Sequence, residues 1–266
     1  MNEDGGQKKM FGWHTPAMDL PYTDFLSQFL PQLVAFIDRE GLRKKVYFHV
    51  SDEPGIPHME AYRKASEFLA RFLSDFPVID ALSSFEFYKS GLVKKPVPSN
   101  NHIEDFVKGK VPELWTYYCV SQWEKVPNRF FNMPSARCRV MGFILYKYQC
   151  QGFLHWGFNF WNSQYSLRAL DPFQSTDADG GFPSGDSFLV YPGKNEPIDS
   201  LRHEVHREAM QDLRALQLLE KSVGRGKVLS ILEKGLKKPL SMTEYPRDSA
   251  WLLATRQRIN AALARI

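Results

Sequence analysis

The 266-residue sequence has few cysteines and no long apolar run. Its three cysteines show no CxxC or Cys/His spacing, and an odd number argues against a disulfide framework, so we expect Cys119, Cys138 and Cys150 to be small buried side chains. No run of about 18 apolar residues occurs, and the polar residues 1–9 lack the apolar segment of a signal peptide. The sequence as given therefore predicts a soluble chain without an export signal, cytoplasmic as it stands.

The sequence also lacks a large excess of either charge sign. The net charge of +4 comes from 34 basic and 30 acidic residues that are well interspersed, so no nucleic-acid or membrane partner is expected. The denser basic clusters, residues 43–45 and 225–238, are typical of solvated faces. Internal repeats and low-complexity tracts are absent, whereas 43% hydrophobic and 14% aromatic residues are enough for a globular core.

Strand-like and helix-like segments alternate along the chain. Such alternation is typical of α/β proteins with parallel strands, joined by right-handed crossovers. We therefore expect about five parallel strands lying side by side with flanking helices. The expected strands are residues 46–50, 76–81, 114–120, 152–161 and 187–191, and the expected helices are residues 24–40, 58–75, 135–150 and 200–220, with Asp199 and Ser200 as candidate caps of the last helix.

Two adjacent carboxylates, Asp52 and Glu53, follow the first expected strand. In barrels of alternating strands and helices, the carboxyl ends of the strands form the catalytic face. Acids in this position also have a simpler interpretation, because Ser51 or Asp52 could cap a following helix with Pro54 in its first turn. The five residues alone leave both interpretations open.

Aromatic and amide side chains alternate in the fourth expected strand. Strand periodicity places His155, Gly157, Asn159 and Trp161 on one face, and Trp156 on the other. Flat apolar rings beside amide groups suit a sugar, which has an apolar face and a rim of hydroxyls. We therefore expect Asn159 and Trp161 to be better ligand contacts than Trp156, unless a bulge shifts the register; alternatively, the rings fill the layer between strands and helices.

A long irregular stretch, residues 162–186, connects the fourth and fifth expected strands. It is rich in Asp, Ser, Gly and Pro and has no helical period. Long connections of this kind in compact domains are usually functional. Its acids do not keep the spacing of a calcium-binding EF-hand loop, so we expect no metal site there.

Several motifs occur in one order and together resemble glycoside hydrolase family 123. The resemblance covers about residues 10–220, including the helix around residues 201–204, and fades after that. Several motifs in a fixed order are more specific than any one of them. The motifs are residues 11–14 (FGWH), 47–54 (YFHVSDEP), 114–117 (LWTY), 152–159 (GFLHWGFN), 171–173 (DPF) and 188–193 (FLVYPG).

The resemblance implies a (β/α)8 TIM-barrel-like catalytic domain of an exo-acting β-N-acetylgalactosaminidase, of the β-N-acetylhexosaminidase type. Such enzymes use the 2-acetamido oxygen of the substrate as nucleophile, and their Asp-Glu pair corresponds to Asp52 and Glu53. Asp52 would stabilise the oxazolinium intermediate, and Glu53, its pKa raised by burial and by its neighbour, would be the acid and base. We expect no cofactor and no metal ion. The substrate-binding candidates are Tyr117, Asn159, Trp161, Trp156, His49, Trp13 and His14.

The implied barrel is incomplete in this sequence, because only five of eight strands can be placed. We expect a single partial catalytic domain over residues 1–266, with disorder over residues 1–10 and a C-terminal helical extension over residues 221–266. Open sheet edges would favour self-association, and an open pocket would leave the isolated chain weakly active or inactive. Ala209 also stands where the family would have a glycine.

Two other functions remain open at this point. The chain could be a truncated or degenerate, non-catalytic carbohydrate-binding remnant that keeps the aromatic residues. It could instead be a different glycosidase, in which Glu53 pairs with Asp80 or with an acid of residues 171–186. The expected partner is in each case a glycan, with terminal β-linked N-acetylgalactosamine under the family interpretation.

Overall fold

The computed structural model describes residues 10–12 and 15–266. The chain divides into two compact units, Met1–Pro96 and Val97–Ile266, and each unit is described by itself. The candidate residues Trp13 and His14, and nearly all of the segment expected to be disordered, lie outside the described residues. Among the described residues, no helix is long and apolar enough to cross a membrane.

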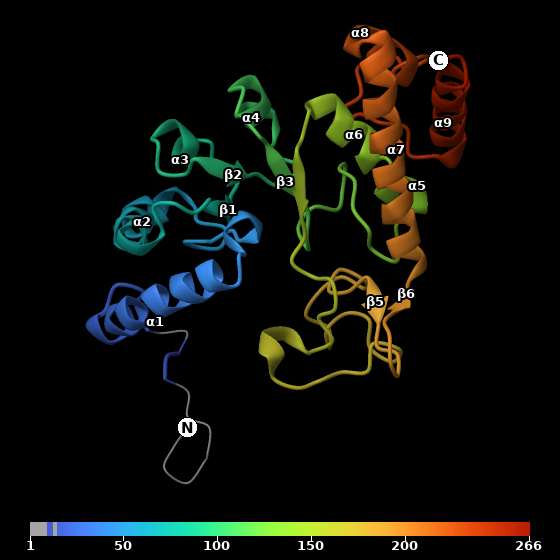
Figure 1. The fold of residues 1–266 in the computed structure, drawn as a ribbon. Coiled ribbons are helices and arrows are strands. Elements are labelled where there is room, and N and C mark those ends of the chain that lie inside the picture. The colour runs from blue at the N-terminus through green and yellow to red at the C-terminus, as the bar shows by residue number, and fades with distance from the viewer. Residues whose placement is uncertain (1–9, 13–14) are drawn as a thin grey trace. The chain divides into compact units, whose positions relative to one another are not determined.

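Two long helices, one short helix and short strand segments build the first unit (Figure 1). α1 (Leu20–Arg39) begins with a proline in its first turn, which suits the fixed φ of that residue, and packs against α2 (Met59–Leu73). Their core joins Leu30 and Ile37 to Leu73 and Phe76. The unit also contains α3 (Glu86–Lys89), the 3₁₀ turns Arg43–Lys45 and Ile56–His58, and β1 (Ile79–Ala81), which forms a two-stranded sheet with β2 (Lys95–Val97) at the unit boundary.

The first expected strand is much shorter than predicted. Within residues 46–50 only Phe48 is bridged, in parallel orientation, to Val78. Beyond Phe48, the amides of Val50 and Ser51 donate to the side chain of Asp80 instead of to a backbone carbonyl. A side chain therefore replaces the sheet ladder at the point where the strand was expected to continue.

The second unit contains the parallel pair β3 (Trp115–Tyr117) and β4 (Gly152–Leu154), in register Trp115 to Gly152. A parallel bridge between Ser99 and Tyr117 extends this pairing on the other side of β3. Gly152 permits the Trp115 ring to lie directly over it, since a Cβ at Gly152 would come within 2.0 Å of that ring. The pair agrees with the predicted parallel arrangement. The short helix α4 (Glu104–Lys108) precedes β3.

The predicted parallel order is wrong after Leu154. β4 ends there, and Asn159 pairs with Phe188 in antiparallel orientation. The fifth expected strand is reduced to β5 (Val190–Tyr191), which pairs antiparallel with β6 (Ile198–Asp199). The described strands therefore form three two-stranded sheets and no closed barrel. The reason lies in side-chain bonds: His155 and Trp156 bind buried polar groups, which turns the chain out of the strand.

Helices make up the rest of the second unit. The predicted helix at residues 135–150 is split into α5 (Ser135–Arg139) and α6 (Met141–Tyr148). α7 (Leu201–Val223) confirms the predicted helix at residues 200–220, and Ser200 caps it by accepting a bond from the His203 amide. Residues 221–266 contain α8 (Arg225–Leu232) and α9 (Ser249–Leu263). Both pack against α7, as α5 and α6 do (Figure 1).

Candidate active site

The Asp52–Glu53 pair lies in a turn and not at a helix cap. The next α-helix, α2, begins at Met59 with His58 at its cap, and the 3₁₀ turn before it is capped by Gly55. The capping interpretation of Ser51 and Asp52 is therefore wrong. Both carboxylates are exposed, so the burial expected for Glu53 is not provided by the described residues.

The backbone of this turn is fixed at its end. Glu53 has a φ of 44°, a left-handed conformation that is uncommon for a residue with a Cβ, and its amide donates to the Ala81 carbonyl over 2.9 Å. Strained backbone of this kind persists only where surrounding contacts hold it, and it is concentrated at functional sites. The two acids therefore project from a segment that is tied to the end of β1.

Asp80 of β1 supplies the other ties. It is fully buried, and its Oδ1 accepts the amides of Val50 and Ser51 over 2.9 and 3.1 Å. Its Oδ2 accepts the Tyr62 hydroxyl over 2.5 Å, and Nδ1 of the half-exposed His49 lies 3.8 Å from Oδ1. Burial raises the pKa of Asp80, against the opposing effect of these hydrogen bonds.

These contacts bear on the alternative that the chain is a different glycosidase, in which Glu53 pairs with Asp80. A carboxylate that acts on a substrate must reach it, but Asp80 is buried and both of its oxygens are occupied by protein donors. Asp80 is therefore a poor partner for Glu53 in that hypothesis. Its contacts suit a role in holding the turn.

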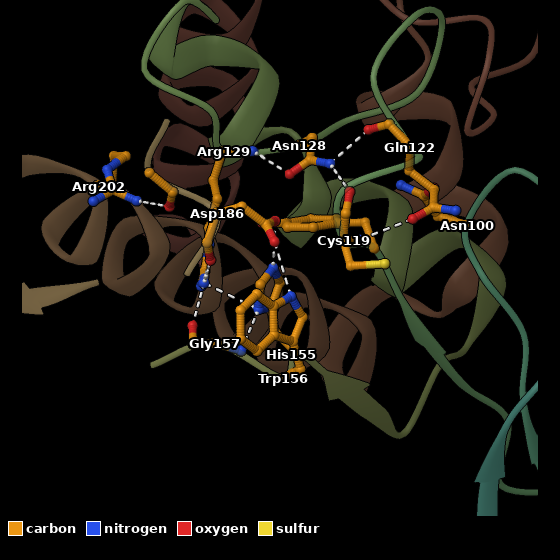
Figure 2. Close-up of polar contacts among 12 residues, drawn as sticks. Asn100, Cys119, Gln122, Asn128, Arg129, His155, Trp156, Gly157, Asp186 and Arg202 are labelled. Carbon is orange, nitrogen blue, oxygen red and sulfur yellow. Dashed lines mark hydrogen bonds and ion pairs between the residues drawn. The ribbon is translucent and has the colours of Figure 1, made fainter. Parts of the chain in front are cut away.

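The second unit contains a buried polar network around Asp186 (Figure 2). Oδ2 of the fully buried Asp186 accepts the indole N–H of Trp156 over 2.8 Å, and its Oδ1 lies 3.3 Å from Nε2 of His155. Nη2 of Arg129 donates to Nδ1 of His155 over 3.0 Å, to the Asp186 carbonyl over 2.6 Å and to the Gly157 carbonyl. The network holds the Trp156 ring through its indole N–H.

The protonation state of His155 follows from its donors. Arg129 and the Gly157 amide, which lies 3.0 Å away, both donate to Nδ1, so Nδ1 carries no proton and the Nε2 proton faces Asp186. Burial lowers the pKa of His155 to about 4, in agreement with a neutral ring. Burial also lowers the pKa of His206 to about 3, and Nε2 of this ring lies 2.9 Å from the Tyr118 hydroxyl.

Among the three sugar-contact candidates of residues 152–161, Trp156 has the most available ring. Trp156 as a whole residue is 43% exposed, and its ring meets Phe160 and Phe182 edge to face, at centroid distances of 5.2 and 4.9 Å. Asn159 is exposed, whereas Trp161 is half-buried and donates to the Val190 carbonyl over 3.0 Å. The strand alternation that favoured Asn159 and Trp161 over Trp156 fails because β4 ends at Leu154.

Tyr117 is buried at the end of β3, and its backbone exchanges bonds with Pro98 and Asn100. The structure thus places His49, Asp52 and Glu53 in the first unit, and Tyr117 with the residues of the 155–161 segment in the second. Within the described ranges, no group of three or more His, Cys, Asp or Glu side chains is placed to hold a metal ion.

Sequence reasoning missed several residues of these networks. Arg129 lies in a stretch without periodicity, and Tyr62 is one of many aromatic residues on an amphipathic helix. Asp186 was considered only as one acid of the 162–186 loop. One signal in the sequence could have indicated the buried networks: Asp80 and His155 are polar residues within otherwise apolar strand segments.

Comparisons with known proteins bear on the family and the fold of the chain. The family model described as "Glycoside hydrolase 123, catalytic domain" matches residues 1–219. A solved structure of a family 123 glycoside hydrolase from Clostridium perfringens, studied for glycolipid glycan hydrolysis, has 17% sequence identity and a TM-score of 0.67. The similarity covers 94% of this chain and 46% of that one, so the chain spans about half the length of this relative. No curated protein matches the chain.

Proposed function

Because the chain belongs to glycoside hydrolase family 123, we propose that it serves the hydrolysis of a glycosidic bond, with Asp52 and Glu53 as the reacting carboxylates. The substrate class that we propose is a glycan with a terminal β-linked N-acetylgalactosamine. The reaction is a substrate-assisted, retaining hydrolysis through an oxazolinium intermediate, as the motif resemblance implies.

One observation carries this assignment: the two adjacent acids project from a turn that is tied at both ends and strained at Glu53. Ordinary retaining enzymes place two carboxyl groups about 5 Å apart on either side of the bond that breaks. Neighbouring residues on one turn do not readily reach both sides, but they can serve different atoms on one side. The arrangement therefore favours a nucleophile supplied by the substrate.

The roles of the pair follow from the charges that develop. The Asp52 carboxylate orients the acetamide N–H and stabilises the positive charge of the oxazolinium ion. Glu53 protonates the leaving oxygen and then removes a proton from the attacking water. A glycan bound against Glu53 would give this side chain the desolvation that its exposed position lacks.

Trp156 is the residue that we propose as the sugar platform. Its exposed ring can stack on the apolar face of a pyranose, and its indole N–H is already bound to Asp186, so the ring is held in one orientation. Asn159, exposed nearby in the sequence, offers an amide to a ring hydroxyl. His49 of the first unit and Tyr117 and Trp161 of the second unit stay substrate-binding candidates.

Separate substitutions of the two acids test the proposal. Glu53→Gln should lower kcat on a methyl β-N-acetylgalactosaminide by about 10²- to 10⁴-fold, but by less than about tenfold on the 2,4-dinitrophenyl glycoside, which departs without protonation. Asp52→Asn should slow both substrates alike, since the oxazolinium ion forms from each. The measurement is kcat of the purified chain on each glycoside.

Asp75→Asn, which changes an exposed acid of the same unit, is the matched control and should leave both rates unchanged. A 2,4-dinitrophenyl β-galactoside, which lacks the acetamido group, should not be hydrolysed. Equal losses on both leaving groups for Glu53→Gln would remove Glu53 as the acid, and hydrolysis of the galactoside would remove the substrate-assisted mechanism.

The exposure of Glu53 also favours a second candidate, a carbohydrate-binding chain that does not catalyse. In that case the chain would bind N-acetylgalactosamine without turnover of any glycoside. Trp156→Ala should then weaken binding by about tenfold or more, because stacking is lost, whereas Glu53→Gln should leave affinity unchanged. Binding of the free sugar in isothermal titration, together with the absence of turnover of any glycoside, distinguishes this candidate from the enzyme.

A further inference from the structure

We propose that Asp80 is a positioning residue for the Asp52–Glu53 turn, acting through the hydrogen bonds that its Oδ1 accepts, and that Tyr62 holds the Asp80 carboxylate in place. The inference rests on the proposed function, in which that turn carries the reacting carboxylates. It assigns a task to a buried acid that does not itself reach a substrate.

The geometry shows how the turn is held. Residues 48–53 run beside residues 77–81 and are tied to them at three levels. Phe48 exchanges backbone bonds with Pro77 and Ile79 over 3.0 and 2.9 Å, Asp80 Oδ1 accepts the amides of Val50 and Ser51, and the Ala81 carbonyl accepts the Glu53 amide. The middle tie is made by a side chain, so a single substitution can remove it.

The chemistry of a carboxylate suits this middle tie. The amides of Val50 and Ser51 converge on one oxygen, and a charged acceptor makes such bonds about twice as strong as a neutral one. The other oxygen takes the Tyr62 hydroxyl, which stays protonated because burial and the Asp80 charge raise the pKa of Tyr62. Tyr62 comes from α2, so the carboxylate is fixed independently of the turn that it holds.

A buried carboxylate is expensive to desolvate, so it is retained only where the hydrogen bonds that it accepts offset that cost. Asp80 contacts the segment that carries the reacting pair, because two of its three hydrogen bonds come from the amides of Val50 and Ser51, the two residues before Asp52. Without them the left-handed Glu53 can relax to a commoner backbone conformation, and both acids shift. A shift of about 1 Å in a reacting group costs on the order of a hundredfold in rate.

Three variants separate positioning from plain stability. Asp80→Ala removes the acceptor and should lower kcat per folded molecule by about 100-fold, with KM within about threefold. Asp80→Asn keeps an oxygen at the Oδ1 position and should recover kcat to within about tenfold of wild type. The kcat of Tyr62→Phe should lie between those of wild type and Asp80→Ala. Asp75→Ala, which changes an exposed acid of the same unit, is the control and should keep the wild-type kcat. Wild-type kcat in folded Asp80→Ala, or equal losses in the Ala and Asn variants, would overturn the proposal.

A second measurement does not depend on turnover. Amide hydrogen exchange followed by NMR should accelerate at least about tenfold at Val50, Ser51 and Glu53 in Asp80→Ala. It should accelerate severalfold at the same amides in Asp80→Asn and Tyr62→Phe, which serve as the test if Asp80→Ala does not fold. Exchange within α7 should not change. If wild type hydrolyses no glycoside, the proposed hydrolysis is not an activity of this chain by itself. Exchange at Glu53 still decides whether Asp80 holds the turn, because unchanged exchange there refutes that role.

Discussion

At the scale of single residues, Gly142 shows how the absence of a side chain sets the distance between two helices. A Cβ at Gly142 of α6 would lie 1.9 Å from the carbonyl oxygen of Ala209 in α7, both residues being buried. Backbone atoms cannot move aside as a flexible side chain can. Ala209, where the family resemblance suggested a glycine, therefore meets a glycine on the opposite helix.

We predict that Gly142→Ala destabilises the chain. Overpacking against a backbone carbonyl costs about 1–3 kcal/mol, which exceeds the gain of up to about 1 kcal/mol from replacing a helical glycine. Urea unfolding measures the difference. The control is Gly226→Ala in α8, where a Cβ would meet nothing within 4 Å, and this variant should be neutral or more stable. A Gly142→Ala variant as stable as Gly226→Ala would contradict the prediction.

At the scale of elements, one carboxylate joins three helices. Asp212 of α7 is fully buried, accepts two bonds from Arg139 of α5 over 2.7 and 3.1 Å, and accepts one from Arg256 of α9 over 2.7 Å. Glu208, on the same helix but 41% exposed, lies 3.2 Å from Arg139. The network thus attaches α9, in the segment expected to be an extension, to the central helix of the unit.

We predict that Asp212→Ala destabilises the second unit by about 3–5 kcal/mol, because it removes the buried counter-charge of two largely buried guanidinium groups and leaves only the more exposed Glu208 beside Arg139. Glu208→Ala should cost less than about 1 kcal/mol, since an exposed ion pair is screened by solvent. Tryptophan fluorescence in urea is the measurement, because five of the six tryptophans belong to this unit. Equal losses in the two variants would contradict the role of burial.

At the scale of the whole molecule, the buried histidines connect stability to pH. Burial lowers the pKa of His155 to about 4 and of His206 to about 3, well below the ordinary value near 6.5. Both rings are therefore neutral in the folded chain and take up protons on unfolding below pH 6.5. Their contribution to stability is complete above that pH and is lost as the pH falls toward 4.

We predict that the free energy of unfolding falls by about 3 kcal/mol between pH 6.5 and pH 5, about half from each ring. His206→Gln should remove about half of this dependence. His58→Gln, which changes an exposed histidine, should leave it unchanged. Urea titrations at the two pH values give the result, and a wild-type stability that does not vary between them would contradict the prediction.

The sequence by itself determined the family, the alternation of elements and the residues of greatest chemical interest. The order of motifs led to the family that the comparisons show. Most helices lie near their predicted positions, because apolar residues at helical spacing identify a buried face without knowledge of what covers it. The parallel β3–β4 pair was predictable for a similar reason, since β-branched and aromatic runs mark strands.

Tertiary structure alone decided where strands stop and what holds the candidate site. Residues 46–50 and 155–161 have strand-like composition, but their amides and side chains bind Asp80, Asp186 and Arg129 instead of continuing a ladder. Sequence periodicity reports which residues are apolar, and it contains no information on a buried polar partner 30 residues away. Long-range hydrogen bonds also hold Glu53 and Trp156. The Glu53 amide is bound to the Ala81 carbonyl, and the Trp156 indole N–H is bound to Asp186.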